Sequence, residues 1–238
     1  MHDIIVRLAH AIAPRFLSGN RASNVAMALK LRRLFSTYKI ATVIDVGANQ
    51  GQYRNFLRDR VGFKGHIHSF EPIPELAAEL TEWAKSDRHW SIHPVALGAG
   101  SGEIQINVMA HTEFSSVHQP TATVDSATDR MNTVVRTIRV PVITLDSMFA
   151  GTNGLKHTYL KIDTQGFDLE VLKGAEETVS EIHALQTEVS FRPIYKGAPD
   201  FEQSFLEFRR RGFSVADLFL VLEDPTHRAM EFDCVMVK

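Results

Sequence analysis

Short runs of apolar and β-branched residues alternate along this chain with segments whose apolar residues recur at helical spacing. One helical segment covers 52–61, and another begins near Pro72 and Pro74 and continues through Trp83. The predicted parallel strands are 41–46, 66–70, 90–97, 158–162 and 185–190. This alternation is typical of an α/β protein with a mostly parallel sheet.

The alternation of strand and helix breaks in the residues that follow Gly98. A turn leads into a segment with apolar residues at every second position from Ile104 to Val108, which predicts an antiparallel strand. A matching strand covers 137–143, and the polar segment between these two strands is too long for a plain connection. We therefore expect an insertion at 99–143 that contains a β-hairpin and a substrate loop.

The two ends of the chain carry further predicted elements. Residues 20–38 read as a helix, and we expect residues 1–39 to form a helical cap over the ligand-binding edge of a domain that covers 40–238. The chain ends with two predicted strands, 212–216 and 232–237, which form a closing hairpin. The helix offers Val25, Leu29, Leu31, Leu34 and Phe35 for packing.

Residues 4–13 are apolar, but Arg7 and His10 interrupt them. This segment is therefore expected to be neither a membrane-spanning helix nor a signal peptide. We expect its apolar face to pack on the domain or on a second subunit, which leaves a homodimer open. Contact with a membrane surface is the alternative.

Composition sets limits on the class of protein and its partners. A chain of 238 residues can form one large α/β domain, and its formal net charge of −2 gives no global basic field for nucleic acid or an anionic membrane. The single cysteine, Cys234, lies in the last apolar strand and cannot form an internal disulfide. We therefore expect a cytoplasmic protein without a nucleic-acid partner or an integral membrane segment.

The stretch ATVIDVGANQGQ at 41–52 reads as a strand, a glycine turn and the start of a helix. Gly47 and Gly51 have no side chain, so the backbone of this turn can approach a ligand closely. The helix that follows directs its free N–H groups toward the same space. Asp45, just before the turn, would repel a phosphate and attract a cation.

A second acid, Glu71, ends the strand at 66–70. An acid at this position can accept hydrogen bonds from both hydroxyls of a ribose. Asn49 stands where a dinucleotide fingerprint needs its middle glycine, which disfavours a nicotinamide dehydrogenase. S-adenosylmethionine has a ribose and a sulfonium but no phosphate, so it suits this pair of acids best. An ordinary turn in an unrelated α/β fold is the alternative.

Four motifs occur in order: IDVGANQGQY at 44–53, FEP at 70–72, VALG at 95–98 and LKIDTQGFDLEVLKGA at 160–175. With these motifs the chain resembles the FkbM family of S-adenosylmethionine-dependent O-methyltransferases over residues about 40 to 190. The resemblance implies a Rossmann-like class I methyltransferase fold, with a mostly parallel seven-stranded sheet, an antiparallel final hairpin and the insertion after strand 3. It also implies methyl transfer to a hydroxyl, in many members that of a sugar in a glycolipid, a polysaccharide or a secondary metabolite.

The turn, the acid at 71 and the VALG strand end, which would cover the adenine, define the cofactor site. The predicted cofactor-binding residues are Asp45, Gly47, Ala48, Asn49, Gly51, Gln52, Tyr53, Glu71, Pro72, Ala96 and Leu97. A small-molecule or glycan acceptor is expected to contact Ser115, Ser116, His118, Gln165 and Arg192. The family usually has Glu-Gly where this chain has Gln165-Gly166, so a role for an acid at that position is in doubt.

Asp163 and Glu188 lie at the ends of strands that are expected to be neighbours, about 5 Å apart in the sheet. One of these acids could be the general base, or both could hold Mg²⁺. Capping of the following helix is the structural alternative for Asp163. Lys161 is expected to point to the opposite face of the sheet from Asp163 and to pair with an acid.

Two alternatives for the general base and for the function stay open, and one enzyme class is disfavoured. His111 and His118 in the polar loop are alternative bases. An amino-methyltransferase of nucleic acids is disfavoured, because the segment after strand 158–162 has no proline motif. A subunit or sensor that binds S-adenosylmethionine without catalysis is the alternative to an enzyme.

Overall fold

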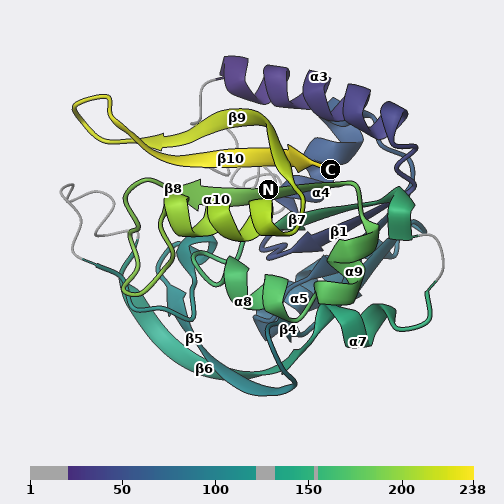
Figure 1. Ribbon diagram of the computed structural model, residues 1–238. Coiled ribbons are helices and arrows are strands. Elements are labelled where there is room, and N and C mark those ends of the chain that lie inside the picture. The colour runs from purple at the N-terminus through teal and green to yellow at the C-terminus, as the bar shows by residue number, and fades with distance from the viewer. Residues whose placement is uncertain (1–20, 122–131, 153–154) are drawn as a thin grey trace, which may run out of the picture.

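A seven-stranded sheet with helices on both faces forms the centre of the protein in this computed structural model, which describes residues 21–121, 132–152 and 155–238 (Figure 1). The strand order is β3-β2-β1-β7-β8-β10-β9. The strands are β1 (Thr42–Val46), β2 (His66–Phe70), β3 (Trp90–His93), β7 (Thr158–Ile162), β8 (Ala184–Ser190), β9 (Ser214–Glu223) and β10 (Ala229–Val237). The first five strands are parallel, whereas β10 is antiparallel to both of its neighbours. The predicted sheet and its closing hairpin are confirmed.

One face of the sheet is covered by the helix that precedes β1 and by the helices that follow β1 and β2. These are α3 (Arg21–Thr37), α4 (Gln52–Phe56), the π-helical segment η1 (Leu57–Val61) and α5 (Pro74–Ala84). Leu31 and Phe35 of α3 join Val43 of β1, Ile67 of β2 and Tyr159 of β7 in one buried cluster. The helix α3 therefore packs on a face of the sheet.

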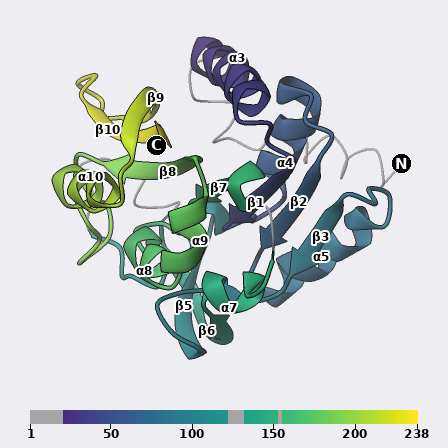
Figure 2. The same ribbon diagram turned by 45° about the vertical axis from the view of Figure 1, so that its right-hand side comes forward.

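The other face of the sheet is covered by helices from the second half of the chain (Figure 2). These are α7 (Leu145–Phe149), the 3-10 helix η3 (Leu155–His157), α8 (Asp168–Lys173), α9 (Glu176–Glu181) and α10 (Phe201–Arg210). Ile44, Leu160 and Leu185 from three adjacent strands pack there against Leu172 of α8 and Phe208 of α10. Because β1 and β7 each send alternate residues to opposite faces, both clusters form on the same strands. The strands are thus buried on both sides.

The predicted insertion forms a second sheet below the first (Figure 1). It consists of β4 (Ala96–Leu97), β5 (Gly102–Met109) and β6 (Val134–Ile143), with the 3-10 helix η2 (Thr112–Phe114) after β5. The strands β5 and β6 are antiparallel, as predicted, and β4 runs parallel to β6. The middle of the polar segment, 122–131, lies outside the described residues.

Two predictions about strand and helix placement need correction. The strand predicted at 90–97 ends at His93, because Pro94 has no N–H for a sheet hydrogen bond, and Ala96 and Leu97 pair with β6 of the second sheet instead. The helix α3 does not cover the ligand-binding edge: of the described residues that line the pocket at that edge, none belongs to it.

The prediction for α3 also fails in detail. Leu31, Leu34 and Phe35 are buried as expected, but Val25 and Leu29 point into solvent. The predicted helix at 4–13 lies outside the described residues. Within the described ranges, no helix is long and apolar enough to cross a membrane.

Candidate active site

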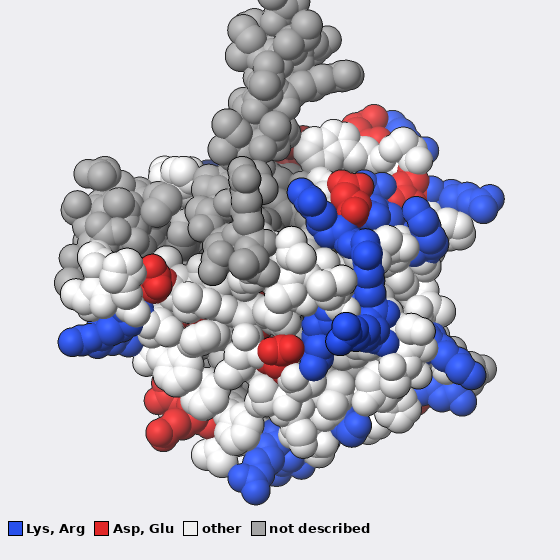
Figure 3. Space-filling view, turned by 90° about the horizontal axis from the view of Figure 1, so that it is seen from above, with Lys and Arg blue, Asp and Glu red and all other residues white. Residues whose placement is uncertain are grey.

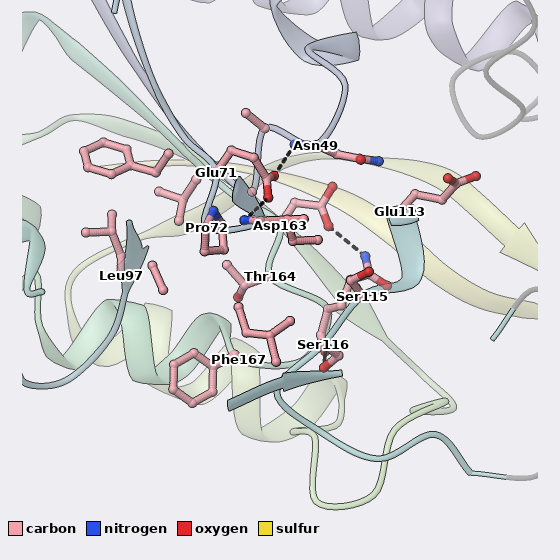
Figure 4. Close-up of a pocket in the computed structure, with 18 of the residues that line it drawn as sticks. Asn49, Glu71, Pro72, Leu97, Glu113, Ser115, Ser116, Asp163, Thr164 and Phe167 are labelled. Atoms are coloured by element: carbon pink, nitrogen blue, oxygen red, sulfur yellow. Dashed lines mark hydrogen bonds between the residues drawn. The ribbon is translucent and has the colours of Figure 1, made fainter. Parts of the chain in front are cut away.

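A pocket opens at the carboxyl ends of β1, β2 and β7, where β1 lies between the other two strands (Figure 4). This is the place in an open α/β sheet where ligands bind. Nine of the eleven predicted cofactor-binding residues line it: Gly47, Ala48, Asn49, Gln52, Tyr53, Glu71, Pro72, Ala96 and Leu97. Asp163, Ser115, Ser116 and Gln165 line it as well.

The glycine turn after β1 is held between β2 and β7. The backbone N–H groups of Gly47 and Ala48 both donate to the carbonyl oxygen of Phe70, at 3.0 Å each. Gly47 has a φ of +83°, and a Cβ atom on it would lie 2.0 Å from the carbonyl oxygen of Asp163. Only glycine fits this position.

Gly51 has a different role from the one predicted. It is not among the pocket-lining residues, and a Cβ atom on it would lie 3.1 Å from Leu80 and 3.3 Å from Trp90. Its φ of +73° lets the chain turn into α4 against these two side chains. Gly51 therefore allows the turn into α4 without itself lining the pocket.

The carboxylate of Glu71 faces the glycine turn. Its Oε2 accepts a hydrogen bond from the backbone N–H of Asn49 at 2.7 Å, and its Oε1 accepts one from the N–H of Ile73 at 2.8 Å (Figure 4). Burial raises the pKa of Glu71 to about 7, even though both backbone hydrogen bonds lower it. The protein thus holds a carboxyl group in the pocket that titrates near neutral pH.

Asp45 is not in the pocket lining, which corrects its predicted contact with the cofactor. Its side chain is fully buried, accepts a hydrogen bond from the Ser69 hydroxyl at 3.1 Å, and lies 3.0 Å from the Nζ of Lys161. The Lys161 ammonium also donates to the carbonyl oxygen of Gly47 and lies 3.5 Å from Asp163. Asp45 therefore holds a buried cation under the glycine turn.

The prediction that Lys161 points away from Asp163 is wrong. Residues two apart on a strand share a face, so Lys161 and Asp163 lie on the same side of β7. The predicted pairing of Lys161 with an acid is correct. Burial alone would lower the pKa of Lys161, but the charges of Asp45 and Asp163 outweigh it and raise that pKa above its usual range.

Gln165 connects the two acids that sequence analysis placed at neighbouring strand ends. Its Nε2 donates to Asp163 at 2.8 Å and to Glu188 at 3.0 Å, and its Oε1 accepts a hydrogen bond from the Tyr195 hydroxyl at 2.9 Å. Asp163 lines the main pocket, whereas Glu188 lines a smaller adjoining cavity. The carboxylates converge on the amide of Gln165.

This arrangement does not fit the predicted Mg²⁺ site. An amide NH₂ group lies between Asp163 and Glu188, and it offers hydrogen-bond donors where a cation would need further oxygen ligands. In the part of the chain that the structure describes, no group of three or more His, Cys, Asp and Glu residues could hold a metal ion.

Asp168 is a buried acid of the site that sequence analysis missed. It accepts hydrogen bonds from the backbone N–H groups of Thr164 and Gly166, and so shapes the loop after β7. Burial raises its pKa to about 6, and the charge of Asp163 adds to this effect. Its position two residues after Gly166, in the first turn of α8, was the signal that could have revealed this contact with the preceding loop.

The insertion covers the pocket through short hydrogen bonds. The Thr112 hydroxyl donates to Asn49 Oδ1 at 2.8 Å, and the Ser116 hydroxyl donates to the carbonyl oxygen of Gln165 at 2.7 Å. Glu113 also lines the pocket (Figure 4). Thr112 and Glu113 were not predicted to contact the cofactor or the acceptor, because only the folded hairpin brings them to the pocket.

Three of the loop residues lie elsewhere than predicted. His118 and Arg192 are outside the pocket lining: His118 borders a surface groove beside α8 and α10, and Arg192 pairs with Asp224 at 3.1 Å. His111 is exposed, which leaves it outside the lining too. None of these residues is placed to contact a ligand in the pocket.

Comparison with known proteins identifies the family. The model of the methyltransferase FkbM domain matches residues 45–215. The chain belongs to the FkbM methyltransferase family. Its members are S-adenosylmethionine-dependent methyltransferases, and the seven-stranded sheet with its antiparallel final strands is the class I methyltransferase fold. No curated protein matches the chain.

A solved structure of the same family agrees in fold at low sequence identity. The chain is similar to the methyltransferase FkbM from Methylobacillus flagellatus KT, with 16% identity, a TM-score of 0.52, and coverage of 84% of this chain and 44% of that one. It therefore spans less than half the length of that relative. Magnesium protoporphyrin IX methyltransferase from Synechocystis PCC 6803, solved with bound S-adenosylmethionine, gives 9% identity, a TM-score of 0.49, and coverage of 95% and 85%.

Proposed function

We propose that this FkbM-family protein transfers a methyl group from S-adenosylmethionine to a hydroxyl of a sugar-containing small molecule or glycan. The observation that carries the proposal is the position of Asp163. Its carboxylate lines the same pocket as Glu71 and the glycine turn, so a base and a ribose acceptor share one cavity. The cofactor supplies an electrophilic methyl group, and the residues of the chain supply position and proton acceptance.

The residues of the pocket fit S-adenosylmethionine. Glu71 is placed to accept hydrogen bonds from ribose hydroxyls, and Leu97, Val95 and Phe167 provide an apolar wall for the adenine. Two buried polar atoms of lining residues, Asn49 Nδ2 and Thr164 Oγ1, have no hydrogen-bond partner among the described residues. Polar groups of the bound cofactor would satisfy them.

Asp163 is the proposed general base. Its side chain is 30% exposed, and the amide of Gln165 and the ammonium of Lys161 fix its orientation. A carboxylate held in this way can take the proton of a hydroxyl as the oxygen attacks the methyl carbon. Most of the acceleration would come from holding the acceptor and the cofactor in line. Because the residues do not fit a metal ion, the proposal includes no step that needs one.

Several features support a hydroxyl acceptor in a reducing compartment. Ser115, Ser116 and Glu113 offer hydrogen-bonding groups on the insertion side of the pocket, where sugar hydroxyls would find partners. Burial raises the pKa of the free Cys234 thiol to about 12, so this thiol is unreactive. We also propose a cytoplasmic location, because Cys234 is the single cysteine of the chain and cannot form an internal disulfide.

The test is a methyl-transfer assay with radiolabelled S-adenosylmethionine and a panel of free sugars, glycolipids and polysaccharides. Asp163→Asn is expected to lower the transfer rate roughly 10²- to 10⁴-fold. Its dissociation constant for S-adenosylmethionine, measured by calorimetry, should change little. Asp59→Asn, at an exposed acid outside the pocket, is the matched control and should transfer at the wild-type rate.

Two outcomes would contradict the proposal. Full transfer by Asp163→Asn would remove the general-base role. If wild-type protein binds the cofactor but methylates no hydroxyl acceptor in the panel, the chain is better described as a binding subunit or sensor.

A further inference from the structure

The helix α3 has an outer face that combines exposed aliphatic and basic side chains. Val25 is 57% exposed and Leu29 is 48% exposed, and Arg32 and Arg33 follow on the same side of the helix. These positions are spaced by four, seven and eight residues from Val25, so they form one stripe. The opposite face of α3 is buried in the core, which fixes the stripe toward solvent.

Basic side chains of a neighbouring segment extend this stripe. The Arg32 guanidinium donates to the carbonyl oxygens of Arg60 and Val61, and so brings η1 against α3. Arg60 of this segment and Lys64, which follows it, are exposed. Lys and Arg side chains gather on this side of the molecule in the view from above α3 (Figure 3). We call Val25, Leu29, Arg32, Arg33, Arg60 and Lys64 the α3 face.

Most of the positive charge on the α3 face is uncompensated. Among the described residues, no ion pair joins Arg32, Arg33, Arg60 or Lys64 to an acid, and α3 contains no Asp or Glu. Asp59 in η1 is the exposed acid next to Arg60. By contrast, the nearby Arg58 pairs with Asp87 at 3.1 Å. The charge of the face is thus available to a partner.

The formal net charge of the whole chain is only −2, but its charged residues are unevenly distributed along the sequence. The first 40 residues contain seven Lys and Arg and a single Asp, whereas the remaining residues contain 19 Lys and Arg and 27 Asp and Glu. Residues 21–40, which include α3, contain five of these Lys and Arg and no acid, so a negatively charged surface would attract the α3 side of the molecule. The absence of a global basic field therefore does not exclude a local one.

We propose that the α3 face docks on an anionic membrane surface. Aliphatic side chains next to Lys and Arg are what an interfacial helix presents to the boundary between lipid headgroups and acyl chains. Nucleic acid would use the basic residues but has no counterpart for Val25 and Leu29, since base recognition relies on aromatic or hydrogen-bonding groups. The face lies outside the pocket, so the proposal is independent of the proposed methyl transfer.

The test is flotation of the full chain with vesicles. We expect binding to phosphatidylcholine vesicles that contain roughly 30% phosphatidylserine, loss of binding with phosphatidylcholine alone, and release at roughly 0.5 M salt. Arg33→Glu/Arg60→Glu should lower the partition coefficient at least about tenfold, since each basic residue near the surface contributes. These two side chains make no hydrogen bond that the structure records in its described part, so the fold should tolerate the change.

Two further double variants separate the contributions of the aliphatic and the basic side chains to vesicle binding. Val25→Ser/Leu29→Ser should weaken binding to vesicles and leave any binding of single-stranded RNA unchanged. Arg139→Glu/Arg209→Glu, a charge-matched control at exposed positions on β6 and α10, should bind vesicles like the wild type. Cofactor binding should be unchanged in all variants, which shows that the fold is intact.

Three results would overturn the proposal. The first is that wild-type protein does not bind the anionic vesicles. The second is that the α3-face variants and the control variant lose vesicle binding equally. The third is that the protein binds RNA, and that Arg33→Glu/Arg60→Glu abolishes this binding while vesicle binding persists.

Discussion

The Nζ atom of Lys161 lies 3.0 Å from Oδ1 of Asp45, and both side chains are almost completely buried. Removing the cation alone should leave Asp45 buried without its partner. We expect Lys161→Met to lower the free energy of unfolding by roughly 3–5 kcal/mol, as measured by urea denaturation. The double variant Asp45→Asn/Lys161→Met should lose less than the sum of the single variants.

Lys173→Met is the matched control for this prediction. Lys173 pairs with Glu170 on the exposed side of α8, where an ion pair contributes at most about 1 kcal/mol. Equal losses in Lys161→Met and Lys173→Met would show that the buried pair does not stabilise the site.

A pair of glycine variants tests how tightly the turn is held. Gly47 and Gly62 have φ values of +83° and +76°, but only Gly47 has a backbone atom within reach of an added Cβ. Gly62→Ala should cost roughly 1–2 kcal/mol through its backbone conformation alone. Gly47→Ala should cost more than about 3 kcal/mol, because its Cβ would collide with the carbonyl oxygen of Asp163. Similar costs in thermal unfolding would argue against this clash.

Glu71 makes cofactor binding depend on pH. Its pKa is raised from 4.5 to about 7, and ribose hydroxyls bind the ionised form. The dissociation constant should therefore rise about tenfold between pH 8 and pH 6, and binding near pH 7 should release a proton. Calorimetry in buffers with different ionisation enthalpies measures both quantities.

Glu71→Gln is the control, and it should bind the cofactor weakly with little change over this pH range. The contribution of Glu71 to the free energy of unfolding changes with pH in the opposite direction from its contribution to cofactor affinity. A raised pKa stabilises the folded protein below pH 4.5, and this contribution is lost as the pH rises through about 7. A wild-type affinity that is flat from pH 6 to pH 8 would remove Glu71 from the cofactor site.

Gln165→Glu tests the amide between the two acids. The variant replaces a donor to Asp163 and Glu188 with a third carboxylate of the same shape. We expect a loss of roughly 1–3 kcal/mol in the free energy of unfolding. The loss should grow as the pH rises, because the crowded carboxyls take up a proton at low pH. Urea denaturation at two pH values measures this.

Gln105→Glu serves as its control, since Gln105 is exposed on β5 of the insertion. It should change stability little at either pH. If Gln165→Glu also changes stability little at both pH values, the hydrogen bonds from the Gln165 amide to Asp163 and Glu188 do not stabilise the fold.

Sequence periodicity predicted the central strands well, because buried parallel strands are short apolar runs with clear ends. The errors have local causes. The strand at 90–97 was predicted without weighing Pro94, and Lys161 was placed on the wrong face although it lies two residues from Asp163. Val25 and Leu29 were assigned to the core from hydrophobicity alone.

The candidate site was predictable where it depends on strand ends. Glu71 and Asp163 follow β2 and β7, so topology alone brings them to one pocket. Thr112 could not be placed, because its contact with Asn49 depends on the path of a long insertion. The same holds for Tyr195, which reaches Gln165 across 30 residues of sequence.

The two ends of the insertion lie next to each other. The N–H of Gly98 donates to the carbonyl oxygen of Ile143 at 3.0 Å, so the two ends of the insertion at 99–143 are held together next to β4. Such a closed module can be exchanged between relatives without altering the order of the seven strands. New acceptor preferences can thus arise by exchange of the insertion, while Glu71 and the glycine turn lie outside it and stay the same.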